Sequence, residues 1–168
     1  MPVHAIVLSL NSEYFRTLFS VSGMKEIHQK YITIKVNIGE GQYLEKLIHA
    51  FYDQTVLRGL TTPELLQVLQ VADRFSCVTY IEKCISLLKK ANITSFSECN
   101  DIIEHLGNFE RKIARFIGNK CVDIEQRCVK FMVKRFCPLE NKIMQHDNFL
   151  SITYKSLLLL LRSHLPFT

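Results

Sequence analysis

Residues 3–26 read VHAIVLSLNSEYFRTLFSVSGMKE, and the assignment of the fold starts from this stretch. Its apolar run, residues 5–8, begins three residues after Pro2 and leaves little room for a preceding element to cover it. Ser12 then suits a helix N-cap, because its hydroxyl can accept a hydrogen bond from a backbone N–H of the first turn. The apolar side chains that would be buried follow at helical spacing: Tyr14 or Phe15, Leu18 and Phe19. The stretch predicts a short amphipathic helix.

The composition is that of a folded protein. The chain has 168 residues, of which 48% are apolar and 22% are charged, so it can bury one domain of ordinary size or two small ones. The start has no basic region before its apolar run, so no secretory signal is expected. The longest apolar run, Leu157–Leu161, is far shorter than the roughly 20 residues that span a membrane. We therefore expect a soluble protein of the cytoplasm and/or nucleus with no membrane partner.

The net charge of +5 is spread over the whole chain. Residues 1–90 carry ten basic and eight acidic side chains, and residues 91–168 carry eleven and eight. The densest basic cluster lies on what are interpreted as solvated helix faces: Arg111, Lys112, Arg115 and Lys120. Nucleic-acid binding usually requires a coherent basic stripe, often with aromatic platforms. No nucleic-acid partner is expected.

The first half of the chain mixes helices with one strand. YITIKV, residues 31–36, alternates apolar and polar side chains and is rich in β-branched residues, which predicts a half-buried strand. Apolar spacing predicts a helix from about Gln42 to Asp53. Thr62 is the expected cap of the next helix, with Pro63 at its first position. A further helix is expected to end at Lys90 and to bury Ile81, Cys84, Ile85 and Leu88.

From residue 91 onward the pattern predicts only helices. Residues 95–98, SFSE, form a capping box, and Gly107 with Asn108 is expected to end that helix. Two more helices are expected around residues 113–117 and 124–132. A last one, capped by Thr153, would bury Leu157, Leu158 and Leu161. The fold class is therefore α+β and mostly helical, with an internal boundary at about residue 90.

The side chains that could carry chemistry form no catalytic or metal-binding pattern. The six histidines are scattered, and the sequence has no nucleophile elbow, phosphate loop or HExxH motif. Two cysteine pairs are seven residues apart, which differs from the close spacing of zinc sites. We interpret the cysteines as small hydrophobes on buried helix faces: Cys77, Cys84, Cys99, Cys121, Cys128 and Cys137. The chain is expected to be an interaction protein without cofactors, and not an enzyme.

The opening stretch also carries a family resemblance. Residues 3–26 resemble the middle of a BTB/POZ domain, where a His near a Val-Leu pair is followed by Ser, Tyr-Phe and another Phe. ITIKV, residues 32–36, resembles the next strand of that family, and LIHAFYDQTV, residues 47–56, resembles its aromatic-Tyr helix end. Residues 65–88 resemble the closing helix pair. The resemblance implies a BTB/POZ domain at 1–90 followed by a BACK-like helical domain at 91–168.

The resemblance implies a role in protein–protein interaction. Many BTB proteins with a BACK extension resemble substrate adaptors of cullin-3 ubiquitin ligases, in which a hydrophobic-x-Glu motif helps to hold the cullin. The matching residues here are Met24, Lys25 and Glu26, and residues 95–117 would line the rest of that groove. Met24 has an unbranched apolar side chain that can adapt to a partner helix, and Glu26 can accept hydrogen bonds from the partner. The alternatives are that this tripeptide is only a solvated loop, and that the protein is a scaffold or transcriptional cofactor that self-associates without cullin.

One departure from the family bears on dimerisation. Family members usually have a strand pair before the VHA segment, and its first part contributes to the dimer. This chain starts at that segment, so an amino-terminally truncated domain with an open sheet edge is expected. Ile6, Val7 and Leu10 of the first helix are then expected to be exposed and to form a dimer or partner surface. The expected partners are a cullin scaffold, the protein itself or other BTB proteins, and an unknown substrate protein.

Overall fold

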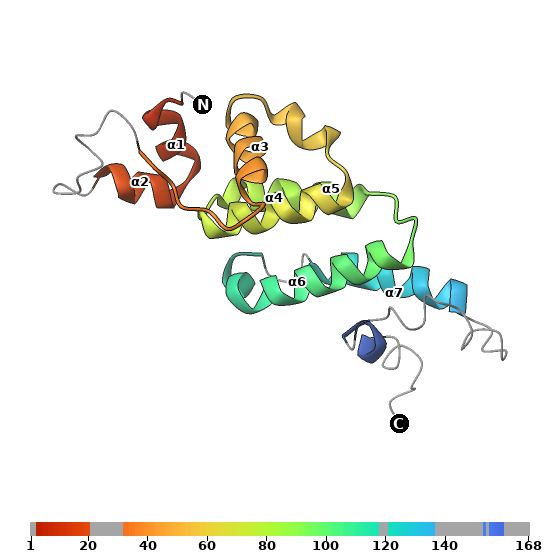
Figure 1. Ribbon diagram of the computed structural model, residues 1–168. Coiled ribbons are helices and arrows are strands. Elements are labelled where there is room, and N and C mark those ends of the chain that lie inside the picture. Colours follow the sequence, from red (N-terminus) through yellow and green to blue (C-terminus); the bar gives the residue numbers. More distant parts are fainter. Residues whose placement is uncertain (1–2, 21–31, 118–120, 137–152, 154, 160–168) are drawn as a thin grey trace. The chain divides into compact units, whose positions relative to one another are not determined.

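The computed structural model describes residues 3–20, 32–117, 121–136, 153 and 155–159, with side chains throughout except at 108–117 and 135–136 (Figure 1). Backbone contacts divide the chain into two units, residues 1–87 and 88–168. The predicted boundary at residue 90 lies three residues after this division. The helices are α1 (Ala5–Asn11), α2 (Glu13–Ser20), α3 (Gly41–Tyr52), the 3₁₀ helix η2 (Gln54–Gly59), α4 (Thr62–Arg74), α5 (Val78–Lys90), α6 (Phe96–Ile117) and α7 (Val122–Phe136).

Residues 32–36, which were expected to form a strand, alternate in burial as a strand does but are not paired with another strand among the described residues. Ile32, Ile34 and Val36 are half-buried, whereas Thr33 and Lys35 are exposed, so the predicted alternation is confirmed. Tyr31 lies outside the described residues, and the described ranges contain no strand, so the small sheet expected there is not confirmed.

The start of α2 is tied to the turn between α4 and α5. The Ser12 hydroxyl accepts a hydrogen bond from the Phe15 N–H at 3.1 Å and donates one to the Phe75 carbonyl at 2.6 Å. The Phe15 ring stacks on the Phe75 ring, with centroids 5.6 Å apart, and Tyr14 meets Phe75 edge-on. The predicted cap at Ser12 is confirmed. Of the two aromatic candidates, Phe15 is the buried one and Tyr14 stays partly exposed.

The helix that was expected to be capped by Thr62 begins one residue earlier. α4 starts at Thr62 and its N-cap is Thr61, whose backbone N–H and hydroxyl both donate to the Glu64 carboxylate, at 2.9 and 2.8 Å. A glutamate at the third helical position can bond back to the cap, and this reciprocal contact fixes Thr61 as the cap. The prediction of Thr62 was therefore wrong by one position.

Helix α5 continues from the first unit into the second, and α7 caps its last turn. The apolar face predicted for α5 is confirmed, since Ile81, Cys84, Ile85 and Leu88 are all buried. The Arg127 guanidinium donates to the carbonyls of Lys89 and Ala91. These donors satisfy carbonyls that have no partner within the helix itself.

The second unit contains one long helix where two were expected. α6 runs without a break from Phe96 to Ile117, so the prediction that Gly107 and Asn108 end a helix was wrong. A glycine in a helix interior costs only about 1 kcal/mol relative to alanine, which is not enough to end a helix whose face is buried. The Ser95 hydroxyl accepts from the Glu98 N–H at 3.1 Å, which confirms the first half of the predicted capping box. The Glu98 carboxylate accepts from the backbone N–H of Thr94 at 2.9 Å, one residue before the position that the capping box predicts.

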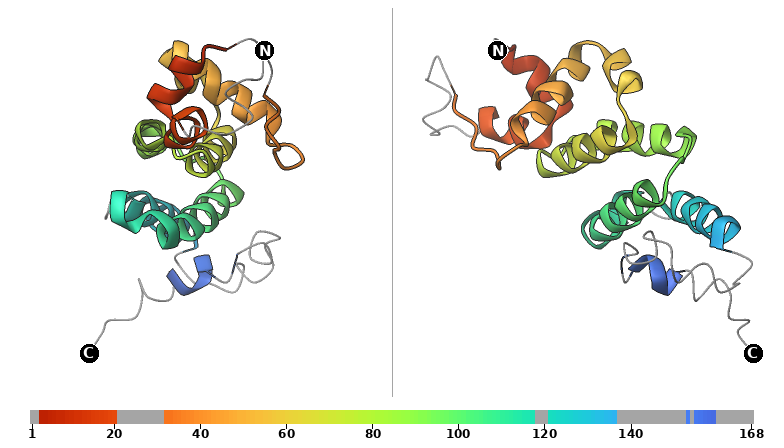
Figure 2. Two further views of the ribbon diagram at one scale, coloured as in Figure 1. Left: turned by 90° about the vertical axis from the view of Figure 1, so that its left-hand side faces the viewer. Right: turned by 45° about the vertical axis from the view of Figure 1, so that its right-hand side comes forward.

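α6 and α7 pack side by side (Figure 2). All but one of their described predicted apolar residues are buried: Cys99, Ile102, Ile103, Leu106, Ile124, Cys128 and Met132. Phe131, also predicted for this face, is only half-buried. Residues 155–159 form a short helical segment after Thr153, as predicted. Leu158 is half-buried but Leu157 is exposed, so the burial of Leu157 was predicted wrongly, and Leu161 lies outside the described residues. Among the described helices, none is both long and apolar enough to cross a membrane.

Candidate protein-interaction surface

The first helix is anchored at its start by α3. His4, the N-cap residue of α1, donates its backbone N–H to the Tyr52 hydroxyl at 2.9 Å, and its ring Nδ1 lies 3.0 Å from the same oxygen. Leu8 is buried on the inner side of α1. Helix α1 contacts both α2 and α3, so its orientation within the first unit is fixed on two sides.

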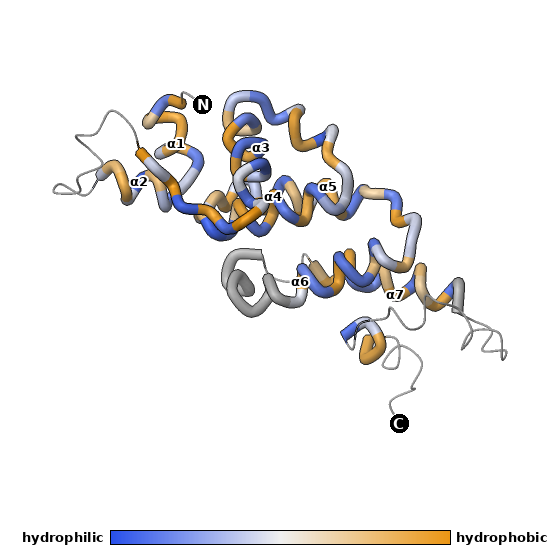
Figure 3. The backbone as a smooth tube through the Cα atoms, in the orientation of Figure 1, coloured by the Kyte–Doolittle hydropathy of each residue, from blue (hydrophilic) through white to orange (hydrophobic). Residues whose placement is uncertain are grey.

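The outer side of α1 is apolar and open. Ile6 is 69% exposed and Leu10 is 71% exposed, and residues four apart lie on the same face of a helix. Val7 is only half-buried. Figure 3 shows hydrophobic residues along this short helix. Of the three residues predicted to form a partner surface, the structure therefore exposes Ile6 and Leu10 together and turns Val7 partly inward.

One further exposed apolar residue, Ile38, was not predicted from the sequence. Ile38 is fully exposed at the tip of the turn Asn37–Glu40, where Gly39 has a φ of +84°. The signal for this position was Gly39 itself, because a glycine at the third place of a turn leaves the residue before it at the tip.

The turn is held in place by an acidic side chain. The Glu40 carboxylate accepts from the backbone N–H of Asn37 at 2.9 Å and from its side-chain amide at 2.8 Å. Arg74 of α4 also pairs with Glu40 and donates to the Lys35 carbonyl at 3.1 Å. Burial would raise the pKa of Glu40, but the hydrogen bonds from Asn37 and the charge of Arg74 outweigh it and hold that pKa below its ordinary value. Ile38 is thus presented on a fixed turn.

The residues expected to hold a cullin are not among those that the structure describes. Met24, Lys25 and Glu26 lie in the segment 21–31, outside the described residues. The side chains of the basic cluster at 111–120 lie outside them as well. Both interpretations stay predictions.

The part of the chain that the structure describes contains no metal-binding cluster. No group of three or more His, Cys, Asp or Glu side chains is placed there to bind a metal ion. The described cysteines are all buried, whereas Cys137 lies outside that part. Burial raises the pKa of the Cys77 thiol to about 12 and that of Cys84 to about 12. These thiols stay protonated at neutral pH, which makes them poor nucleophiles and fits their prediction as small hydrophobes.

Comparison with known proteins gives one family. The family model of the BTB/POZ domain matches residues 1–92. Two BTB/POZ domain-containing proteins of Arabidopsis thaliana are each 33% identical to this chain, over 88 and 92 residues, which are 52% and 55% of it. The aligned parts cover only 15% and 17% of those two proteins, so the similarity spans a small share of each. No solved structure matches the chain.

Proposed function

Since the chain belongs to the BTB/POZ domain family, we propose that it is a protein–protein interaction module that acts as a substrate adaptor of a cullin-3-type RING ubiquitin ligase. A BTB/POZ domain is an interaction module, and the match over residues 1–92 is the observation that carries the proposal. The adaptor role is the finer part. It is supported by the tripeptide Met24-Lys25-Glu26, which fits the hydrophobic-x-Glu pattern, and by the helical region that follows the domain.

In this proposal the cullin packs on Met24 and Glu26 while a second surface of the chain binds the substrate. Met24 supplies an unbranched apolar side chain that adapts to a partner helix. Glu26 supplies a carboxylate that accepts charge-assisted hydrogen bonds, and these are stronger than neutral ones. The proposed location is the cytoplasm and/or the nucleus.

The test is a binding measurement with the purified amino-terminal region of a cullin. We expect the double variant Met24→Ala/Glu26→Ala to bind at least tenfold more weakly, about 1.4 kcal/mol, in isothermal titration calorimetry. The matched control is Gln70→Ala, which changes an exposed residue of α4 and should leave the affinity unchanged. Equal affinity of the double variant and the wild type would remove the cullin role from this segment.

A second candidate is a scaffold or transcriptional cofactor that acts by self-association without cullin. The exposed pair Ile6 and Leu10 favours it, because a face of two large apolar side chains on one helix is typical of a surface that binds protein. A pull-down that recovers BTB/POZ proteins but no cullin would select this candidate over the adaptor.

A further inference from the structure

Gly107 lies in the interior of α6, where glycine is unfavourable unless something needs the space. A Cβ atom built there would lie 1.4 Å from the Lys155 Nζ and 2.5 Å from its Cε. A side chain at position 107 would therefore displace the flexible end of the Lys155 side chain from its present position. Gly107 leaves a notch in the surface of α6, and the side chain of Lys155, 48 residues later in the sequence, occupies it.

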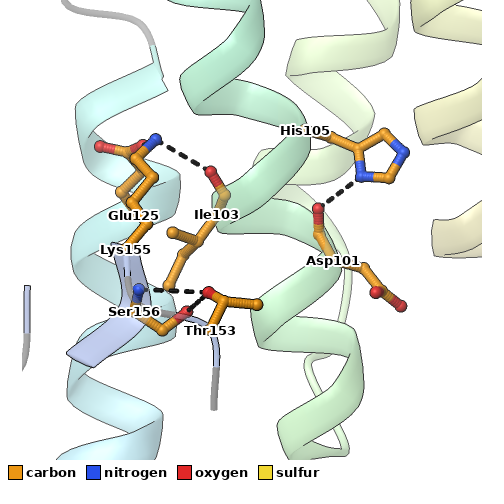
Figure 4. Close-up of polar contacts among 7 residues, drawn as sticks. All are labelled: Asp101, Ile103, His105, Glu125, Thr153, Lys155 and Ser156. Atoms are coloured by element: carbon orange, nitrogen blue, oxygen red, sulfur yellow. Dashed lines mark hydrogen bonds and ion pairs between the residues drawn. The ribbon is translucent and has the colours of Figure 1, made fainter. Parts of the chain in front are cut away.

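The ammonium group of Lys155 finds two acceptors beside this notch. It donates to the Ile103 carbonyl of α6 at 3.0 Å and pairs with the Glu125 carboxylate of α7 at 3.2 Å (Figure 4). The backbone N–H four residues after Ile103 belongs to Gly107, so this carbonyl lies next to the notch. A carbonyl has a second lone pair that can accept the ammonium. We call Gly107, the Ile103 carbonyl and the Glu125 carboxylate the lysine notch.

The segment that carries Lys155 depends on these contacts. Its helical turn is closed by the Leu157 N–H donating to the Thr153 carbonyl at 2.9 Å and by the Ser156 N–H donating to the Thr153 hydroxyl at 3.3 Å. Ser156 is buried, but Leu157 is exposed. Helices this short are not stable alone in water, because nucleation costs more than so few hydrogen bonds return. Contact with α6 and α7 supplies the missing stability.

We propose that the face of α6 and α7 around the lysine notch is a binding site for a lysine-bearing helical segment, and that Thr153 and residues 155–159 of this chain occupy it. The site selects a primary ammonium group. The space over Gly107 accommodates only a slender side chain, and the Glu125 carboxylate forms an ion pair with its charge. A methionine has the length without the charge, and an arginine has the charge on a broad planar group. All residues of this site follow residue 92, where the match to the BTB/POZ family ends, so the proposal goes beyond the function proposed above.

The first test combines two substitutions, Gly107→Ala and Lys155→Met. In the wild type we expect Gly107→Ala to displace the Lys155 side chain. The urea midpoint of unfolding should fall, and the rate of amide hydrogen exchange at Ser156 and Leu157 should rise at least tenfold. In a chain that carries Lys155→Met, Gly107→Ala should raise the midpoint instead, because alanine is the better helix former and nothing is left to collide with it. The same sign in both backgrounds would overturn the proposal.

Two matched controls separate the notch from general effects. Gly59→Ala adds a methyl group where nothing lies within 4 Å, and Lys130→Met removes an exposed lysine of α7. Neither should change exchange at Ser156 and Leu157. A change as large as that of Lys155→Met would overturn the assignment to the notch.

The second test adds the segment from outside and does not depend on how well the glycine variant folds. The probes are two labelled peptides, TYKSLLL with the sequence of residues 153–159 and TYMSLLL with the lysine replaced, titrated by anisotropy into the full chain carrying Lys155→Met. The lysine peptide should bind at least tenfold more tightly, and Gly107→Ala should abolish the difference. Equal affinities would overturn the proposal. A wild-type dimer that Lys155→Met dissociates would place the segment of a second copy in the notch and overturn occupancy by the same chain.

Discussion

At the scale of the residue, Ser12 is the best example of one side chain with two structural roles. Its hydroxyl caps α2 through the Phe15 N–H and also satisfies the Phe75 carbonyl, and the residue is only 2% exposed. Water therefore cannot replace either hydrogen bond if the hydroxyl is removed. Loss of a buried partner costs the desolvation of the group that is left behind.

We expect Ser12→Ala to lower the free energy of unfolding by about 1–3 kcal/mol, since it removes a cap and leaves a buried carbonyl short of a partner. Urea unfolding followed by circular dichroism measures this cost. The control is Thr17→Ala on the exposed face of the same helix, which should change stability by less than about 0.5 kcal/mol. If both variants cost the same, the hydroxyl of Ser12 has no special role.

Half of the role of Ser12 could be predicted from the sequence. The cap is local, because a serine immediately before an amphipathic pattern is well placed to accept from the first turn that follows it. The bond to Phe75 is not local, since it joins residues 63 positions apart, and no periodicity predicts which carbonyl will lie nearby. The turn that exposes Ile38 has a local signal in Gly39, but the Arg74 contact that helps to hold this turn joins residues 34 positions apart and could not be predicted in the same way.

At the scale of the element, α3 and α4 are joined by an ion pair at the first turn of α4. The Lys46 ammonium lies 2.5 Å from the Glu64 carboxylate, which also accepts from the Thr61 N–H at 2.9 Å. The hydrogen bond from Lys46, followed by those from Thr61, lowers the pKa of Glu64 from 4.5 to about 2. One carboxylate thus links two helices and caps one of them.

This depressed pKa predicts a pH dependence of stability. A carboxylate whose pKa is lower in the folded state stabilises the fold above its unfolded pKa, and that contribution is lost as the pH falls. The window runs from about 4.5 down to about 2. We expect the difference in urea midpoint between wild type and Glu64→Gln to be largest near neutral pH and to shrink through this window. A difference that stays constant across it would show that the charge of Glu64 contributes nothing.

The same scale shows why α6 was divided wrongly. A glycine followed by an asparagine is a typical helix end, and judged locally the prediction at Gly107 was reasonable. The space at Gly107 is needed for Lys155, a residue of another segment, so the glycine serves packing and not termination. The segment 32–36 is the reverse case. Its alternation was read correctly, but a strand also needs a partner to pair with, and alternation alone does not supply one.

At the scale of the whole molecule, the exposed face of α1 predicts self-association. We expect the chain to form dimers or larger species whose amount rises with concentration, and Ile6→Ser/Leu10→Ser to shift it toward the monomer, because each substitution removes exposed apolar surface. Sedimentation velocity over a range of concentrations measures the shift. Since both side chains point outward, the urea midpoint of the double variant should stay close to that of the wild type. A wild-type chain that stays monomeric at every concentration would contradict the prediction.

The bond between Ser12 and Phe75 also has a consequence for how the protein is made. Because the two residues are 63 positions apart, a ribosome that adds about 5–20 residues per second needs about 3 to 13 seconds between them. Throughout that interval the N-cap of α2 lacks its distant carbonyl, and the ring of Phe15 has no Phe75 to stack on. The first helix pair therefore leaves the ribosome with its apolar faces open and must stay soluble until the α4–α5 turn arrives. During synthesis, the part of the chain that carries its family signature is the part most exposed to chaperones and premature partners.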